Sequence, residues 1–351
     1  MSIAWSRVSS PSGFRNVVFS VCVSSGRVFA VGFDESLGYG VGRFRVESYS
    51  SRDGKLLASW VDEKGYPLAA LTTCTSMGGF IYAVGYTSRF WSIIVFDRDL
   101  KIHRRTDFKE PCLAPFSAVI VGKDLYVAGS NINPGGSTAL SVVKVPLDEL
   151  VVEKAFTESA GGAGAGAYAV VYNSKVNQLA VGGFINSEEE LKWLLVLLDK
   201  DLENAETIKP GVEGSVLGLA VDTEGSYYAV DGHRLAKLAA SGELLKTIEV
   251  PGVKVHASRD EKSPLGRYVT VIAGSEVYVL RNDLTSTVDS AKLMKEPGSL
   301  AAVPGSMDSD DGNIYFALTR VVSRDKWSWA VYALRVKIGG KRWKILFGPR
   351  S

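Results

Sequence analysis

Apolar and polar positions alternate in short runs along the whole chain of 351 residues, and turn-forming residues separate the runs. Residues 197–208, LLDKDLENAETI, resemble residues 95–106, VFDRDLKIHRRT: an apolar run passes through Asp-x-Asp-Leu into a more polar run. Such a pair of runs around a turn rich in Asp, Asn or Gly is typical of two antiparallel strands in a hairpin. The likeness between distant segments predicts one structural unit that is used repeatedly.

This unit recurs along the sequence with drift. An apolar run such as VFAVGF, IYAVGY or QLAVGG precedes each turn, and a second run of small, apolar residues such as VVFSVCV or AYAVVY precedes that one. The seven turn motifs begin at Ser50, Val95, Val145, Leu197, Leu238, Leu280 and Val336. Four strands repeated roughly every 40–56 residues are typical of propeller blades.

We therefore expect one all-β domain, a seven-bladed β-propeller of four-stranded antiparallel blades. Radial stacking buries both faces of every blade, which an isolated four-stranded sheet cannot do. The expected blades span residues 14–62, 67–108, 115–156, 164–208, 214–250, 253–293 and 298–348. Residues 3–8, IAWSRV, also alternate, and we expect this N-terminal strand to close the ring onto the last blade.

Residues 77–99, MGGFIYAVGYTSRFWSIIVFDRD, resemble a kelch repeat, in which an IYAVGG-like second strand leads to a third strand that ends in an aromatic residue and an Asp. Gly85 is followed by Tyr86 here, whereas Gly182 and Gly183 keep the glycine pair of the kelch pattern. The resemblance implies a propeller. Kelch-like propellers mostly bind other proteins, and a minority are enzymes that act on sugars or alcohols.

Charge and hydropathy exclude few functions. The 40 basic and 38 acidic side chains leave a net charge of +2, so no global field attracts nucleic acid or an anionic membrane. The N-terminal segment lacks the apolar run of a secretory signal, and no segment approaches the ~18 apolar residues that would cross a bilayer. We expect a cytoplasmic protein with no membrane partner.

The three cysteines are too few for a disulfide framework and form no CxxC pair. Cys22 and Cys74 lie in apolar runs, so we expect both to be small buried residues that stay reduced. A Cys74–Cys112 bridge, or a reactive thiol at Cys112 beside Pro111, is the alternative.

Propeller topology sorts the connections between strands into two faces. With strands A to D counted outward, the D-to-A and B-to-C connections share one face, and the B-to-C connections include the long polar segments DESLGYGVG, NINPGGST, NSEEELK and RVVSRDK. Long loops on a rigid scaffold commonly carry binding residues. The expected binding residues are Tyr39, Arg89, Asn131, Asn133, His233, Arg324, Lys326 and Trp327.

Other conspicuous residues have structural interpretations. Trp91, Trp193 and Trp329 recur at the start of third strands, which favours packing between blades over stacking on a ligand. The Asp-x-Asp pairs are expected to form turns. The glycine-rich residues 161–168 precede a strand and no Lys-Ser/Thr pair follows them, which argues against a phosphate loop.

Metal and cofactor binding are not expected. The segment DSDDGN, residues 308–313, resembles a calcium loop, but one residue is missing between Asp310 and Gly312. Asp308 and Asp310 are therefore only weak candidates for metal ligands.

We favour a non-catalytic protein-binding scaffold that presents its long B-to-C loops to a protein partner. One alternative is an enzyme for a small, carbohydrate-type metabolite in the central funnel, with His256 as general base near Asp260. Another is a weak nucleic-acid binder that uses Arg324, Lys326 and the basic strand GGKRWK from Gly339, which the near-neutral net charge disfavours.

Overall fold

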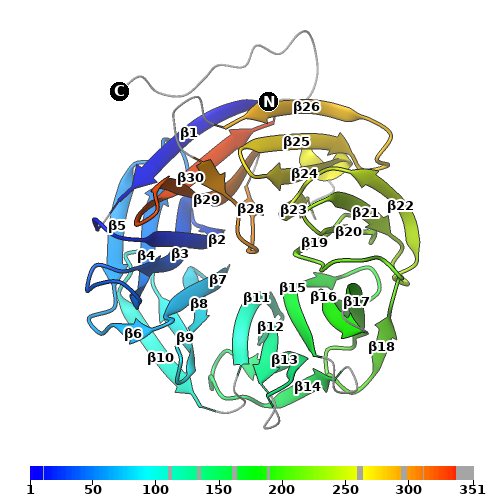
Figure 1. Ribbon diagram of the computed structural model, residues 1–351, viewed down its shortest axis with the longest axis horizontal. Helices are drawn as coiled ribbons and strands as arrows, with labels where there is room; N and C mark the ends of the chain where they lie inside the picture. The colour runs from blue at the N-terminus through cyan, green and yellow to red at the C-terminus, as the bar shows by residue number, and fades with distance from the viewer. Residues whose placement is uncertain are drawn as a thin grey trace.

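The computed structural model describes residues 1–10, 12–109, 113–132, 136–159, 164–187, 190–258, 264–293, 299–310 and 312–336. The described chain forms seven antiparallel sheets arranged in a ring, with one turn of 3-10 helix, η1 (Pro264–Arg267) (Figure 1). The predicted seven-bladed β-propeller is thus confirmed. Among the described residues, no helix has the length and apolar character needed to cross a membrane.

Each blade runs outward from an inner strand with small side chains to a solvent-exposed outer strand. Blade 1 contains β2 (Asn16–Ser24), β3 (Arg27–Asp34), β4 (Val41–Ser50) and β5 (Leu56–Val61), with β6 (Tyr66–Pro67) added to β4. Blade 2 contains β7 (Ala70–Met77), β8 (Phe80–Tyr86), β9 (Trp91–Phe96) and β10 (Ile102–Phe108). Blade 3 contains β11 (Leu113–Val121), β12 (Asp124–Ile132), β13 (Thr138–Pro146) and β14 (Lys154–Glu158).

Blades 4 to 6 repeat this order. Blade 4 contains β15 (Ala165–Asn173), β16 (Gln178–Ser187), β17 (Glu190–Leu198) and β18 (Ala205–Ile208). Blade 5 contains β19 (Gly218–Val221), β20 (Tyr227–Val230), β21 (Arg234–Leu238) and β22 (Leu244–Glu249). Blade 6 contains β23 (Lys254–Ala257), β24 (Tyr268–Ala273), β25 (Glu276–Arg281) and β26 (Thr287–Lys292).

Blade 7 joins the two ends of the chain. It contains β27 (Ser299–Ala301), β28 (Asp308–Ser309), β29 (Asn313–Ser323) and β30 (Lys326–Arg335), and its outer strand is β1 (Ser2–Ser9). β1 pairs with β30 from Ser2 opposite Arg335 to Ser9 opposite Trp329, which confirms the predicted closing strand. The expected C-terminal strand from Gly339 lies outside the described residues, and β1 occupies the edge of β30 on which such a strand would have paired.

The inner strand of blade 7 is split. β27 and β28 both pair with β29, and the connection between them turns toward the centre of the ring (Figure 1). There the Val21 N–H donates to the Ser306 carbonyl at 3.4 Å, so this connection docks on β2 of blade 1. The buried Lys254 ammonium group of blade 6 donates to the Phe19 carbonyl, also on β2. Blades 6 and 7 therefore both bond to the first strand of blade 1.

The three tryptophans of the third strands are core residues, as predicted, although only Trp91 begins its strand, whereas Trp193 and Trp329 lie within theirs. Trp91, Trp193 and Trp329 are each at most 1% exposed. The indole of Trp193 donates to Asp231 of blade 5 at 3.2 Å, and that of Trp329 donates to the Phe33 carbonyl of blade 1 at 3.4 Å. These side chains therefore fix each blade against the next one.

The repeated turns between third and fourth strands are structural, as expected. Asp97 accepts the Asp99 and Lys101 amides at 2.9 Å each, and Asp199 accepts the Glu203 amide at 2.9 Å. The leucines of these turns adopt a left-handed backbone although they are not glycine: φ is 63° at Leu100, 54° at Leu150, 55° at Leu202 and 54° at Leu284. All four leucine side chains are buried, so apolar burial offsets the backbone strain.

The expectation that the buried cysteines stay unpaired is wrong. Cys22 on β2 and Cys74 on β7 form a disulfide, with Cα atoms 5.8 Å apart, that links the inner strands of blades 1 and 2. Their sequence separation of 52 residues hides the pairing from sequence reasoning, because only the stacking of two blades brings the side chains together. Cys112, the alternative partner, lies outside the described residues.

Candidate functional site

The B-to-C and D-to-A connections of blades 7, 1 and 2 bring four of the expected binding residues into one region. Tyr39 lies in the β3–β4 connection and is 67% exposed. Trp327 is the second residue of β30, after the exposed Arg324 of the β29–β30 turn and the exposed Lys326 that begins the strand. These residues come from opposite ends of the sequence, and ring closure places them side by side.

Arg15 joins these residues and was missed by the sequence analysis. Its guanidinium carbon lies 4.5 Å from the ring centre of Tyr39 and 5.0 Å from that of Trp327. Arginine stacks well on aromatic faces, so the three side chains form one cation–π stack. The D-to-A connection shares the face of the B-to-C loops, and that rule was the signal that could have identified Arg15 and its exposed neighbour Phe14.

The stack rests on backbone hydrogen bonds and an acidic group. The Glu35 amide donates to the Arg15 carbonyl at 3.0 Å, and the Trp327 amide donates to the Phe14 carbonyl at 3.4 Å. Glu35 is 7% exposed, and burial raises the pKa of its carboxyl although the Gly40 amide and the Arg15 charge oppose the shift. Asp325 lies 3.7 Å from the Arg15 guanidinium.

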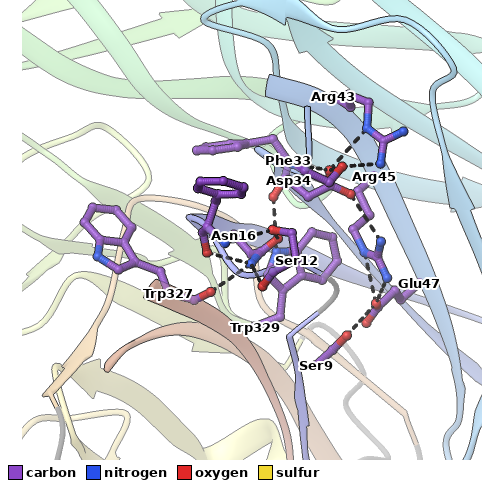
Figure 2. A network of polar contacts seen from close by, with 12 residues as sticks. Ser9, Ser12, Asn16, Phe33, Asp34, Arg43, Arg45, Glu47, Trp327 and Trp329 are labelled. Atoms are coloured by element: carbon purple, nitrogen blue, oxygen red, sulfur yellow. Dashed lines mark hydrogen bonds and ion pairs between the residues drawn. The ribbon is translucent and has the colours of Figure 1, made fainter. Parts of the chain in front are cut away.

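A buried network of charges lies behind this surface, between blades 1 and 7 (Figure 2). Arg45 donates to Glu47 at 3.0 Å and to Asp34 at 3.2 Å, and Arg43 donates to Asp34 at 3.3 Å. Glu47 also accepts the Ser9 hydroxyl of β1 at 2.7 Å. Because Arg43, Arg45 and Glu47 alternate along β4, their side chains share one face of the blade.

Asp34 stays ionised in this network. Burial alone would raise the pKa of its carboxyl, but hydrogen bonds from Ser36 and the charges of Arg43 and Arg45 outweigh that effect and lower the pKa. A hydrogen bond beside this network fixes the backbone at Trp327: the Asn16 side-chain amide donates to the Trp327 carbonyl at 2.9 Å (Figure 2). The network thus ties the N-terminal and C-terminal segments beneath the exposed stack.

The other expected binding residues lie apart from this stack. Arg89 is exposed in the β8–β9 connection of blade 2, and His233 is exposed in the β20–β21 connection of blade 5. Asn131 is half-buried within β12, where it pairs with Leu113 and Ala139. Asn133 lies outside the described residues.

The central channel holds a cavity of about 340 Å³ lined by inner strands and by residues 305–309. His256 of β23 lines it, as expected, together with Asp308 and hydroxyl groups such as that of Ser117. Asp260, which the enzyme hypothesis places beside His256, lies outside the described residues, and that hypothesis stays a prediction. The described lining could hold a small polar solute.

The weak metal candidates use their carboxylates for internal bonds. Asp308 accepts the Val23 amide at 2.7 Å and the Ser309 amide at 2.8 Å. Asp310 accepts the Tyr315 hydroxyl at 2.6 Å. Within the described chain, no group of three or more His, Cys, Asp or Glu side chains could hold a metal ion.

Comparison with known proteins supports the fold. The structure of the Neurospora crassa Pan2 WD40 domain is similar, with a TM-score of 0.59 and 9% sequence identity over 90% of this chain and 89% of that one. No family model matches the sequence, and no curated protein matches it. At this identity the likeness concerns the fold alone, and the kelch-like character of the repeats stays a prediction.

Proposed function

We propose that the protein is a non-catalytic protein-binding module whose binding surface is the loop face of blades 7, 1 and 2. One observation carries the proposal: large apolar side chains are exposed on this face, in its connections or at the strand ends beside them. They are Phe14, Leu37, Tyr39, Leu68 and Val322. Clustered apolar exposure of this kind marks interaction sites more often than isolated apolar residues do.

Exposed apolar residues elsewhere have a different distribution. Most of them lie on outer strands, as Val8 and Leu57 do, or singly at the opposite face, as Met77 at the end of β7 and Val176 in the β15–β16 turn do. The loop face also combines apolar groups with Tyr39, Trp327 and an arginine, the residue types that dominate the energetics of protein interfaces. Propellers commonly act as protein-interaction scaffolds, and the fold agrees with such a role.

A comparative capture experiment tests this proposal. Immobilised protein is incubated with extract of the source cells, and retained proteins are quantified for wild type, for Tyr39→Ser with Leu68→Ser, and for a control pair on the opposite face, Met77→Ser with Val176→Ser. We expect a partner that wild type and the control retain and that the loop-face pair loses at least tenfold. Equal retention by all three proteins would refute the proposed surface.

A further inference from the structure

The loop-face patch is defined as Phe14, Arg15, Leu37, Tyr39, Leu68 and Trp327, which lie in or beside neighbouring connections of one face. Contacts described above connect Phe14, Trp327, Arg15 and Tyr39. Leu37 packs directly over Gly65, since a Cβ atom added to this glycine would lie only 2.8 Å from the Leu37 Cδ1. Gly65 leads through Tyr66 and Pro67 to Leu68, and the Ser88 amide donates to the Pro67 carbonyl at 3.1 Å. The patch therefore follows the connection between blades 7 and 1, the β3–β4 connection and the connection between blades 1 and 2.

Leu68 shows backbone strain that burial does not offset. Its φ is 58° and its side chain is 73% exposed, whereas the four leucines with the same conformation in the turns between third and fourth strands are buried. A left-handed backbone is strained for a non-glycine residue because the Cβ atom approaches the following carbonyl oxygen. Strain without a folding benefit occurs preferentially at functional positions, which agrees with a role for Leu68 in contacting a partner.

The charges around the patch are predominantly positive. Arg89, Arg324 and Lys326 are exposed and make no ion pair with any residue of the described chain. The acids beneath the patch are already engaged: Asp34 pairs with Arg43 and Arg45, and Asp62 pairs with Arg105 at 2.7 Å. Asp325, on the same hairpin as Arg324, lies 3.7 Å from Arg15, and the exposed Glu63 of the β5–β6 connection is followed by the exposed Lys64. The rim of the patch thus attracts negative charge.

We propose that the loop-face patch binds a segment of a partner protein that combines acidic residues with large apolar residues. The apolar side chains would lie on Phe14, Leu37 and Leu68, and the carboxylates would pair with Arg89, Arg324 and Lys326. Complementary charge at the rim of an apolar surface sets partner choice and association rate. This inference rests on the proposed function and adds to it the chemistry of the partner.

The apolar side chains at the centre of the loop-face patch argue against nucleic acid as the partner. A nucleic-acid surface gains most of its affinity from cations along a phosphate backbone, whereas here exposed aliphatic side chains occupy the centre and the cations lie at the rim. A second copy of the chain is another conceivable occupant, because exposed acids such as Asp148, Glu149 and Asp201 lie on the opposite face. Both occupants are outcomes of the test below.

The test selects displayed random dodecapeptides on the intact protein and measures the affinities of labelled synthetic winners by fluorescence anisotropy. One variant pair, Arg324→Ala with Lys326→Ala, removes charge, and a second, Leu37→Ser with Leu68→Ser, removes apolar surface. Lys123→Ala with Met77→Ser, exposed on the opposite face, is the matched control. Circular dichroism and thermal melting confirm that every variant is folded.

We expect winners rich in Asp or Glu together with Phe, Leu or Trp, whose affinity falls at least tenfold in either patch variant, stays unchanged in the control and weakens as salt rises. Winners without acidic residues that still require Leu37 and Leu68 would overturn this inference and leave the proposed function standing. Winners indifferent to both patch pairs would contradict both proposals. Failure to select any peptide overturns the inference. So does tighter, patch-dependent binding of a labelled 20-nucleotide oligothymidine, or a patch-dependent dimer in light scattering.

Discussion

Between blades 2 and 3 the chain passes directly from one blade to the next, whereas blades 7 and 1 come from opposite ends of the chain. The junction of blades 2 and 3 is filled by apolar side chains, among them Val84, Ile93, Leu125 and Val143. The junction of blades 7 and 1 contains an apolar cluster around Trp5, Tyr49 and Trp329, and in addition the Asp34–Arg45–Glu47 network.

The difference shows what ring closure requires. Apolar contact is non-directional, so it stabilises blades that chain connectivity already holds in order. β1 must instead find one edge and one register among several exposed strand edges. Its alternating apolar pattern sets the register, and directional polar contacts such as the Ser9–Glu47 hydrogen bond add to that selection. Our hypothesis is that the buried network selects the correct closure, a role attested for some buried polar groups.

We expect the largest effect from a substitution that breaks the Asp34–Arg45–Glu47 network. Glu47→Ala leaves Arg45 with a buried, poorly compensated charge and should lower the free energy of unfolding by about 3–5 kcal/mol. The double change Arg45→Met with Glu47→Leu should restore most of that stability, whereas Leu125→Ala at the junction of blades 2 and 3 should cost about 2–5 kcal/mol through its cavity. Urea denaturation measures all three. If the double variant stays as unstable as the single one, the network is itself a main source of stability rather than of specificity.

Reduction of the disulfide comes next. The Cys22–Cys74 bond closes a long loop, and bonds of this kind typically contribute about 2–4 kcal/mol. Thermal melting with and without a reducing agent should show a lower midpoint after reduction, and Cys22→Ala should show the lower midpoint in both conditions. An unchanged midpoint would mean that packing alone holds blades 1 and 2 together.

Lys254 should make the free energy of unfolding depend on pH in the alkaline range. Burial lowers the pKa of its ammonium group to about 7, below the ~10.4 of an unfolded lysine. Between these values only the unfolded chain holds the proton, so the free energy of unfolding should rise with pH across that window. Lys254→Met should be more stable than wild type at pH 7 by about 1–3 kcal/mol, with a difference that shrinks toward pH 10. A flat wild-type profile between those pH values would contradict the buried position of Lys254.

Asp34 should make the free energy of unfolding depend on pH in the acid range. Its pKa is lowered in the folded state, so its stabilising effect is present above the pKa of the unfolded carboxyl and is lost as pH falls through the folded pKa. Asp34→Asn should lower stability by about 1–2 kcal/mol at neutral pH and flatten the loss below about pH 4. Denaturation profiles of both proteins from pH 3 to 7 measure this, and parallel profiles would exclude Asp34 as the source.

The smallest expected effect separates stability from binding. Tyr39→Ser removes an exposed ring from the Arg15 stack, and surface substitutions usually change stability by no more than about 0.5 kcal/mol. We expect an unchanged melting midpoint together with weakened peptide binding. A drop of several degrees would show that the stack supports ring closure rather than recognition.

The blade architecture follows from local sequence, because strands and turns depend on residues that are close together in the chain. Alternation, the Asp-rich turns and the small inner-strand residues predict seven sheets, and the alternation of IAWSRV predicts the closing strand. The burial of Trp91, Trp193 and Trp329 follows from their repeated position. The left-handed leucines could not be predicted, because leucine has no local preference for that conformation and adopts it only where packing offsets the strain.

Only the tertiary structure decided which distant side chains meet. The Cys22–Cys74 bond, the Arg15 stack and the Asp34–Arg45–Glu47 network each join residues on different strands or connections, and ring closure brings Trp327 to within stacking distance of a residue 312 positions earlier in the sequence. The sequence by itself determined the number and kind of sheets, since period and turn chemistry act locally. The position of the candidate surface depended on ring closure, because the loops that form it become neighbours only when the first strand pairs with the last.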